Sequence, residues 1–195
     1  NTYKSNPLVE YCLMNEPDFN ISVEVWKSAA QAAINAIRAT GSTQKIQVPG
    51  VAYTGPVNWF QSWYGTSNAV GMVGITDPGD NFVIEVHCYN NADGSGGETL
   101  VPSVTTGITR VKSLADWART NGYRLMIGEV ATGINERGIL CFSNMINYIN
   151  RNSDVIDGWY FWSSNPWRLP GYIYYIQPTS GIESPLMKYV EPFLV

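Results

Sequence analysis

The chain has 195 residues, of which 45% are hydrophobic and 14% are charged. These proportions predict one folded domain over residues 1–195 and exclude an intrinsically disordered chain. The net charge of −4 and the scattered basic residues exclude a nucleic-acid-binding surface, and no apolar run reaches the ~20 residues that span a bilayer.

The first eighty residues predict two strands, one helix and a long connection. The apolar run 8–14 predicts a strand, and apolar residues at helical spacing after Ser22, a favourable N-cap, predict a helix that ends at Gly41. Residues 45–48 predict a short second strand that is terminated by Pro and Gly. The connection 51–80 has no predicted element, and loops of this length in compact domains are commonly functional.

The rest of the chain alternates between strands and helices. Strands are predicted at 82–89, 123–130 and 155–162, and helices at 104–120, 139–149 and 184–195. An aromatic loop at 166–167 follows the last strand. This alternation is typical of an α/β fold, in which a parallel sheet is flanked by helices.

Two parallel architectures are compatible with this order of elements. A doubly wound sheet binds its ligand at one switch point, whereas a (β/α)8 barrel binds at one rim with residues from many strand ends. Polar residues close several of the predicted strands, which favours the barrel, and no G-x-G-x-x-G or P-loop is present to indicate a nucleotide cofactor. Five strands are too few for a whole barrel, which typically needs ~250 residues. We therefore expect an incomplete barrel with its helices on the outside.

Two glutamates close two of the predicted strands. Glu16 follows the run 8–14, and Glu129 ends the run 123–130. Strand ends of a parallel barrel share one rim, so we expect the two carboxyls within about 6 Å, the spacing of a retaining glycosidase. Taken singly, each glutamate fits equally well as a surface residue at the end of a strand.

His87 and Tyr89 lie two residues apart in one predicted strand, so their side chains point to the same face. His87 is the only histidine of the chain, which excludes a metal site built on two histidines. No C-x-x-C pair indicates zinc, and the acidic loop 91–98 lacks the spacing of a calcium loop, so no metal is expected. As a core histidine, His87 would need a hydrogen-bonding partner, and Glu85 on the same face is one candidate.

Four segments, in this order, resemble glycoside hydrolase family 5: LMNEP at 13–17, EVHCY at 85–89, IGE at 127–129 and WYFW at 159–162. Within that family, the stretches 47–50, 59–64 and 77–81 resemble those of secreted cellulases from bacteria and fungi. The resemblance covers nearly the whole chain, and it assigns the five strands to strands four to eight of the family's barrel. It therefore implies a partial catalytic barrel and an extracellular protein.

The resemblance also implies a retaining endo-β-1,4-glucanase that acts on β-glucan by a double displacement and needs no cofactor. By resemblance, the acid/base is Glu16, the nucleophile is Glu129, Asn15 contacts the sugar 2-hydroxyl, His87 and Tyr89 line the cleavage subsite, and Trp162 is a stacking platform. The family also carries an Arg and a His on earlier strands, and neither has a counterpart in this chain.

Alternative functions remain open. The chain is also compatible with a non-catalytic or vestigial carbohydrate-binding barrel fragment, and the same chemistry would serve mixed-linkage glucan or mannan. An incomplete barrel exposes unpaired parallel edges, so we expect self-association through the open edge.

Overall fold

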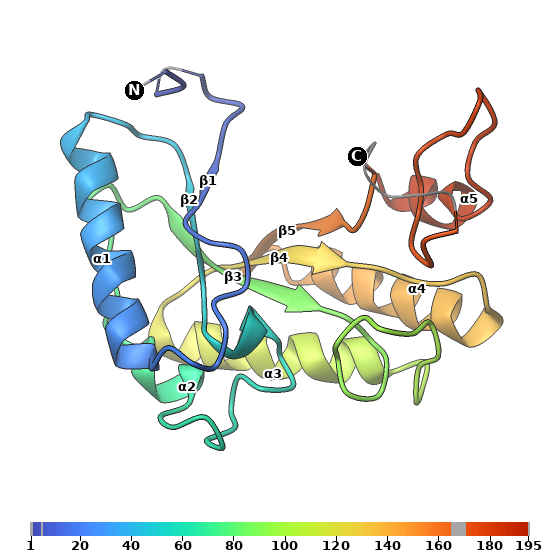
Figure 1. Cartoon of the computed structure of the whole chain (residues 1–195), viewed down its shortest axis with the longest axis horizontal. Helices are drawn as coiled ribbons and strands as arrows, with labels where there is room; N and C mark the ends of the chain where they lie inside the picture. Colours follow the sequence, from blue (N-terminus) through green and yellow to red (C-terminus); the bar gives the residue numbers. More distant parts are fainter. Residues whose placement is uncertain (1, 5, 165–170, 195) are drawn as a thin grey trace.

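The fold is built on one five-stranded parallel sheet. The computed structural model describes residues 2–4, 6–164 and 171–194. Each strand pairs in parallel with its neighbours in chain order, from β1 at one edge to β5 at the other (Figure 1). The strands are β1 (Tyr11–Cys12), β2 (Ile46–Pro49), β3 (Phe82–Cys88), β4 (Leu125–Val130) and β5 (Ile156–Phe161). The predicted parallel α/β fold is confirmed.

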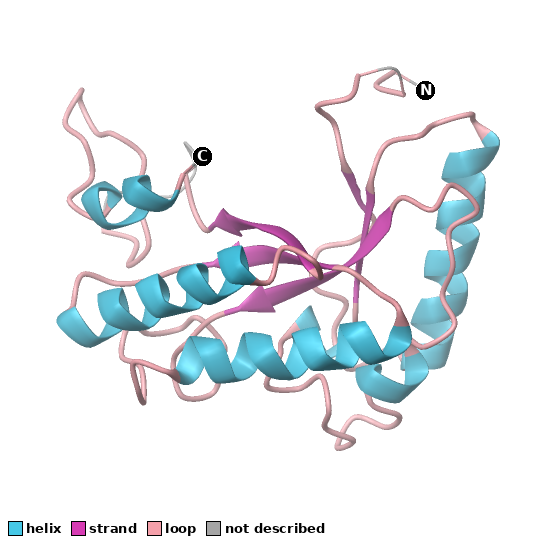
Figure 2. Ribbon diagram, turned by 180° about the vertical axis from the view of Figure 1, so that it is seen from behind, coloured by secondary structure: helices cyan, strands magenta, loops and turns pink. Residues whose placement is uncertain are grey.

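Helices connect the successive strands. They are α1 (Val23–Ala39), η1 (Ala52–Thr54), α2 (Asn68–Gly71), α3 (Thr106–Asn121) and α4 (Glu136–Arg151), followed by α5 (Met187–Val190) and η2 (Glu191–Phe193). Figure 2 shows α3 and α4 lying along one side of the sheet, while the opposite side carries none of the long helices. No helix of the described chain has the length and apolar character required to cross a membrane.

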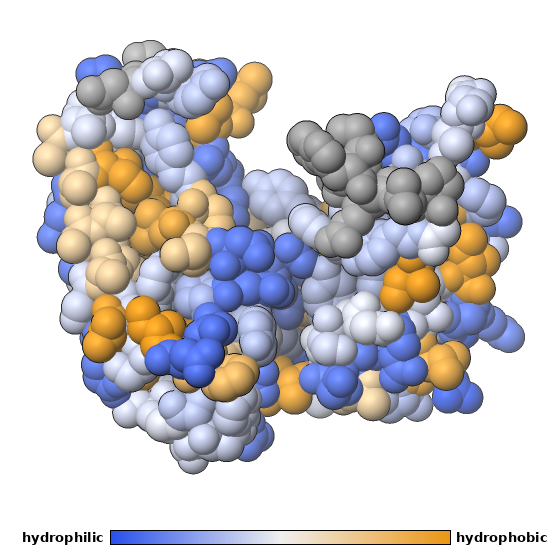
Figure 3. All heavy atoms as spheres, in the orientation of Figure 1, coloured by the Kyte–Doolittle hydropathy of each residue, from blue (hydrophilic) through white to orange (hydrophobic). Residues whose placement is uncertain are grey.

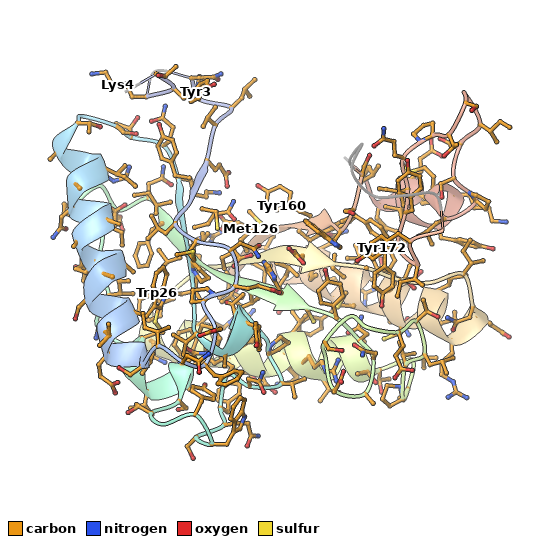
Figure 4. The ribbon with its side chains drawn as sticks, in the orientation of Figure 1. Tyr3, Lys4, Trp26, Met126, Tyr160 and Tyr172 are labelled. Atoms are coloured by element: carbon orange, nitrogen blue, oxygen red, sulfur yellow. The ribbon has the colours of Figure 1, made fainter. Side chains whose placement is uncertain are left out.

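Helix α1 shows how the sequence builds this outer layer. Ser22 caps its first turn, because the Ser22 side chain accepts a hydrogen bond from a backbone N–H at 3.3 Å. Trp26, Ala30 and Ile34 recur at helical spacing and are buried. The Trp26 indole points from the helix toward the strands (Figure 4) and donates to the Pro49 carbonyl at 2.7 Å. The helix is thereby fixed to the end of β2.

Strand β3 separates an apolar face from a polar one. Ile84, Val86 and Cys88 alternate along the strand and are fully buried in the core shared with the helices. Full burial of an Ile or Val side chain contributes about 1.5–3 kcal/mol. Glu85 and His87 point to the other, concave face, where the chain places its polar residues.

The concave face of the sheet is open. Lys45 reaches Asp157 of β5 at 2.5 Å and Glu10 at 3.7 Å, so ion pairs link distant strands across this face. Tyr160 is 47% exposed and stands above the sheet (Figure 4). The space-filling view shows a broad hollow between the part of the chain around α1 and the C-terminal segment (Figure 3). The five strands and their outer helices thus form a half-barrel, as expected for an incomplete (β/α)8 fold.

Several elements differ in extent from the sequence-based predictions. Of the run 8–14 only β1 is a strand, because its ladder with β2 covers two positions. The connection 51–80 contains η1 and α2 and is therefore not the plain loop expected. The predicted helix 184–195 divides into α5 and η2, because Pro192 lacks the N–H that would continue an α-helix. The loop at 166–167 lies outside the described residues.

Candidate active site

The carboxyl ends of β1, β3 and β4 bring Glu16, His87 and Glu129 together. One oxygen or nitrogen atom from each side chain lies within 4.8 Å of the corresponding atoms of the other two. The glutamate oxygens therefore fall inside the expected limit of about 6 Å, close to the spacing of a retaining pair. The convergence of the two glutamates, predicted from their positions at strand ends, is confirmed.

Glu16 is held in a strained backbone conformation. Its φ of 42° lies in the left-handed region, which costs a residue with a side chain about 1–3 kcal/mol. Contacts with η1 offset this strain: the Tyr53 N–H donates to the Pro17 carbonyl at 3.0 Å, and the Ala52 N–H to the Asp18 carbonyl at 3.4 Å. The loop after β1 is thereby tied to η1, with Glu16 at the rim.

The segment η1 is itself left-handed. Ala52, Tyr53 and Thr54 have φ values of 54°, 62° and 51°. The Thr54 hydroxyl accepts from the Gly50 N–H at 3.0 Å and donates to the Glu85 carbonyl at 2.5 Å, which holds the turn against β3. None of the three left-handed residues is Gly or Asn, so no sequence signal announced this turn.

His87 is hydrogen-bonded through both ring nitrogens. Nδ1 lies 2.7 Å from Glu16 Oε1 and 3.5 Å from Glu129 Oε2, and Nε2 lies 2.7 Å from Glu85 Oε1. Burial lowers the pKa of His87, but the hydrogen bonds to Glu16 and Glu85 and the charges of Glu85 and Glu129 raise it to about 10. His87 is therefore an imidazolium at neutral pH, and Glu85 is its partner, as the sequence suggested.

The cluster of Glu16, His87 and Glu129 is better suited to hydrogen bonding than to a metal ion. A metal binds imidazole through an unprotonated nitrogen, and both nitrogens of His87 face carboxylates at 2.7 Å. An imidazolium has no free lone pair on either nitrogen, so His87 in its protonated form would not bind a metal.

Tyr89 donates a hydrogen bond to Glu129. The distance from Tyr89 Oη to Glu129 Oε2 is 2.5 Å. Burial, followed by the charge of Glu129, raises the pKa of Tyr89, so the hydroxyl keeps its proton. The ring packs against Tyr174 with centroids 5.9 Å apart, and a Cβ on Gly96 would lie 2.8 Å from it. Sequence reasoning missed Tyr174 and Gly96, because both come from loops without periodicity.

Glu129 is harder to ionise than an exposed glutamate. Burial raises the pKa of Glu129, and the charges of Glu16 and Glu85 raise it further. The charge of His87 and the hydrogen bond from Tyr89 lower it, but the net direction is upward. Within the described chain, His87 is the only cationic group in ion-pair contact with Glu129. A nucleophilic carboxylate must be ionised, so this site would benefit from a further cation.

Two cavities flank the cluster, and His87 lines both. The cavity beside Glu16 has a volume of about 380 Å³ and is also lined by Tyr53, Asn58, Tyr89, Asp93 and Ser95. The cavity beside Glu129 has a volume of about 410 Å³ and is also lined by Glu10, Asn15, Gln47, Tyr160 and Trp162. All six residues that the sequence singled out therefore lie at one rim of the half-barrel.

Trp162 directly follows β5 and lines the second of these cavities. Its indole Nε1 donates to the Tyr172 hydroxyl at 3.0 Å, which fixes the plane of the ring. Asn15 is exposed and lies beside Glu16 in the loop after β1. An exposed amide and a fixed aromatic plane on one side of a carboxylate pair are chemically suited to a sugar ring.

Comparison with known proteins places this chain among cellulases. The model of the cellulase family, glycosyl hydrolase family 5, matches residues 1–166. Endoglucanase 3 of Humicola insolens is 37% identical over 194 residues, which cover 96% of this chain and 48% of that protein. Endo-beta-1,4-glucanase B of Emericella nidulans is 39% identical over 153 residues, covering 78% of this chain and 44% of that protein. The chain spans about half the length of these relatives.

Solved structures show the same architecture. An endo-beta-1,4-glucanase of Xanthomonas axonopodis pv. citri matches with a TM-score of 0.94 and 37% identity, covering 98% of this chain and 61% of that one. XacCel5A in complex with cellopentaose matches with a TM-score of 0.94 and 36% identity, covering 99% of this chain and 62% of that one. Each of these chains therefore extends beyond the half-barrel described above.

Proposed function

Since the chain belongs to the cellulase family, glycosyl hydrolase family 5, we propose that it hydrolyses β-1,4-linked glucan internally with retention of configuration. Glu129 is the nucleophile and Glu16 the acid/base in this proposal. The observation that carries it is the approach of the two carboxyls, whose oxygens lie within 4.8 Å with His87 beside both. That distance leaves no room for the attacking water of an inverting mechanism.

The reaction proceeds by two displacements. In the first, the Glu129 carboxylate attacks the anomeric carbon while Glu16 gives its proton to the departing glycosidic oxygen, so the sugar becomes an ester of Glu129. In the second, Glu16 removes a proton from water, the water oxygen attacks the anomeric carbon, and Glu129 leaves as a carboxylate. The hydroxyl of Tyr89 and the protonated ring of His87 would stabilise the two carboxylates in turn.

The two cavities support an internal cut in a long chain. The cavity on the Glu16 side would hold the leaving portion, and the cavity on the Glu129 side would hold the portion bound as an ester. Trp162 and Asn15 line the second cavity, where a ring plane and an amide would contact the sugar beside the scissile bond. Because a glucan polymer does not cross membranes, such an enzyme would act outside the cell.

A second candidate function is carbohydrate binding without turnover. It is favoured by the burial of Glu129, which raises the pKa of the nucleophile, and by the open concave face. The 195-residue chain should accordingly hydrolyse soluble cellulose derivatives weakly. A chimera that adds the first three βα units of a relative should be far more active, because loss of one electrostatic partner costs about 100-fold in rate.

The test is reducing-sugar release from carboxymethyl cellulose, mixed-linkage glucan and mannan by the chain and by the chimera. We expect Glu129→Gln to abolish turnover, while calorimetry still detects binding of cellopentaose. Glu16→Gln should slow hydrolysis by about 10²–10⁴-fold. Glu136→Gln, a change at an exposed carboxylate on α4, should leave it unaltered. Turnover that survives Glu129→Gln would refute the mechanism, and equal turnover by chain and chimera would refute the role of the added units.

A further inference from the structure

A buried acid lies beneath the catalytic cluster. Glu85 is 2% exposed, and its Oε1 accepts from His87 Nε2 at 2.7 Å. Its other oxygen, Oε2, is also buried and has no hydrogen-bond partner among the described residues. A buried carboxylate needs a compensating partner, and His87 is the one cationic side chain that forms an ion pair with Glu85 among the described residues.

We propose that Glu85 is a positioning residue that holds His87 doubly protonated, with its Nδ1–H directed at Glu16 and Glu129. The effect of Glu85 on turnover rests on the hydrolytic function proposed above, whereas its effect on the protonation of His87 does not. Glu85 also lines the floor of the cavity beside Glu129, but its contact with the catalytic cluster is the one with His87 Nε2. It acts through the imidazole.

The geometry of the ring explains this role. The two nitrogens of an imidazole are held rigidly on opposite sides of the ring, so a hydrogen bond at one sets the direction of the other. With Nε2 on Glu85, Nδ1 lies 2.7 Å from Glu16 Oε1 and 3.5 Å from Glu129 Oε2. Without an acceptor at Nε2, the ring would be free to turn or to lose a proton from that side.

Strand β4 leaves space for the Glu85 carboxylate because residue 128 is glycine. A Cβ on Gly128 would lie 1.6 Å from Glu85 Oε1 and 2.5 Å from Glu85 Cδ. Any other residue at this position would therefore displace the carboxylate from His87. The Thr54 hydroxyl, which donates to the Glu85 carbonyl at 2.5 Å, fixes the backbone on the other side. The position of the Glu85 carboxylate is therefore set by β3, β4 and η1 together.

The charges around His87 are otherwise all acidic. Glu16 faces it from the loop after β1, Glu85 from β3 and Glu129 from β4, while Tyr89 adds a neutral hydroxyl to Glu129. Within the described chain, no Lys or Arg makes an ion pair with any of the three carboxylates. The pKa of His87, which burial alone would lower, is raised to about 10 in these surroundings, and Glu85 is one of its two closest acceptors.

Cys12 is a further titratable group near this acid. Burial raises the pKa of its thiol, and the charge of Glu85 raises it further. The thiol is therefore neutral at neutral pH and adds no charge beside His87.

The protonation of the two His87 ring nitrogens can be measured directly. Because the chain has a single histidine, ¹⁵N NMR of the imidazole reports His87 without assignment. We expect both nitrogens to stay protonated through neutral pH in the unchanged chain. Glu85→Gln keeps the shape but removes the charge, and should lower the midpoint of the His87 titration by at least about one pH unit. Gly128→Ala should cause a similar shift, because it displaces the same carboxylate.

Controls separate positioning from damage to the fold. Glu136→Gln, on the exposed side of α4, should leave the titration unchanged. Gly128→Ala should add little to Glu85→Gln, because both act through one contact. A ring that titrates near its ordinary value of about 6.5 in the unchanged chain would overturn the proposal. An unaltered titration in folded Glu85→Gln would do the same.

The same variants distinguish this inference from the proposed function. In an active chain or chimera, Glu85→Gln should shift the alkaline limb of the kcat/KM–pH profile to lower pH, together with the midpoint of the His87 titration. If no β-glucan is hydrolysed while the NMR shift appears, the proposed function fails and the positioning role stands. If hydrolysis occurs and neither the limb nor the NMR titration moves, the positioning role fails and the function stands.

Discussion

At the scale of single residues, the site is held together by hydrogen bonds that Tyr89 and His87 donate to carboxylates. Tyr89 donates to Glu129, and His87 donates to Glu16 and Glu85. Since Glu129 is already harder to ionise than usual, each donor that stabilises its anion matters for a nucleophile.

Removal of the Tyr89 hydroxyl tests this dependence. A hydrogen bond to a charged group contributes about 1.5–3 kcal/mol, so Tyr89→Phe should reduce kcat by about 10–100-fold. The pKa of Glu129 should rise further, and the acid limb of the pH–rate profile should move to higher pH. Tyr174→Phe is the matched control, because its hydroxyl donates to the Glu98 carbonyl and not to Glu129. An equal loss in both variants would show that ring packing, and not the proton, is responsible.

The raised pKa of His87 also predicts how stability depends on pH. In the unfolded chain the histidine pKa is about 6.5, whereas in the fold it is about 10. The folded state thus binds the proton more tightly, and the stabilisation is complete below about pH 6.5 and is lost as the pH rises toward 10.

Chemical denaturation across this range, compared between the unchanged chain and His87→Gln, isolates the contribution of the histidine. The unchanged chain should lose stability relative to the variant as the pH rises. Parallel curves would contradict the raised pKa.

At the scale of elements, one ion pair joins three segments around the base of the sheet. Arg38 at the end of α1 donates to both carboxylate oxygens of Asp77, at 2.8 and 2.6 Å. The same guanidinium donates to the carbonyls of Ser42, Gln44 and Asn81, at 3.0, 2.8 and 2.9 Å. The connection before β2 and the one before β3 are therefore held by a single side chain.

Asp77→Asn should destabilise the fold by about 3 kcal/mol, because it leaves a buried guanidinium without its counter-charge. Burial raises the pKa of Asp77, but hydrogen bonds from Arg38 and from the loop lower it to about 2. This stabilisation is thus present above the unfolded pKa of about 3.9 and is lost as the pH falls through 2. Urea denaturation at neutral and acid pH measures both effects. Asp116→Asn, in an exposed pair with Lys112, should change the midpoint little at either pH.

At the scale of the whole molecule, the half-barrel leaves surface exposed that a closed barrel would bury. Leu8, beside the edge strand β1, is 90% exposed, and Tyr160 stands 47% exposed over the concave face. Unpaired parallel edges and apolar side chains in water favour pairing with another chain.

We expect the 195-residue chain to self-associate with increasing concentration, and the chimera with the added βα units to remain monomeric. Light scattering after size-exclusion chromatography measures both. Leu8→Lys places a charge at the open edge and should weaken association, whereas Leu140→Lys, on the outer helix α4, should not. A monomer at all concentrations would contradict the prediction.

The sequence by itself determined the features that depend on neighbours in the chain. Alternating apolar runs predicted the strands and their order, and Ser22 predicted the start of α1. Period-two spacing predicted that Glu85 and His87 share one face of β3 with Tyr89, the residue just after the strand. The positions of Glu16 and Glu129 at strand ends predicted that these two glutamates converge. The resemblance to a known family added roles for these residues that no spacing could assign.

Only the tertiary structure decided what these side chains meet. The left-handed backbone at Glu16 exists because η1 supplies its hydrogen bonds, and neither segment signals this alone. The charge of His87 depends on three carboxylates from three separate elements, and the position of Glu85 depends on a missing side chain at Gly128. Conformational strain and pKa are set by burial and by contacts between residues distant in sequence, and these exist only once the strands have come together.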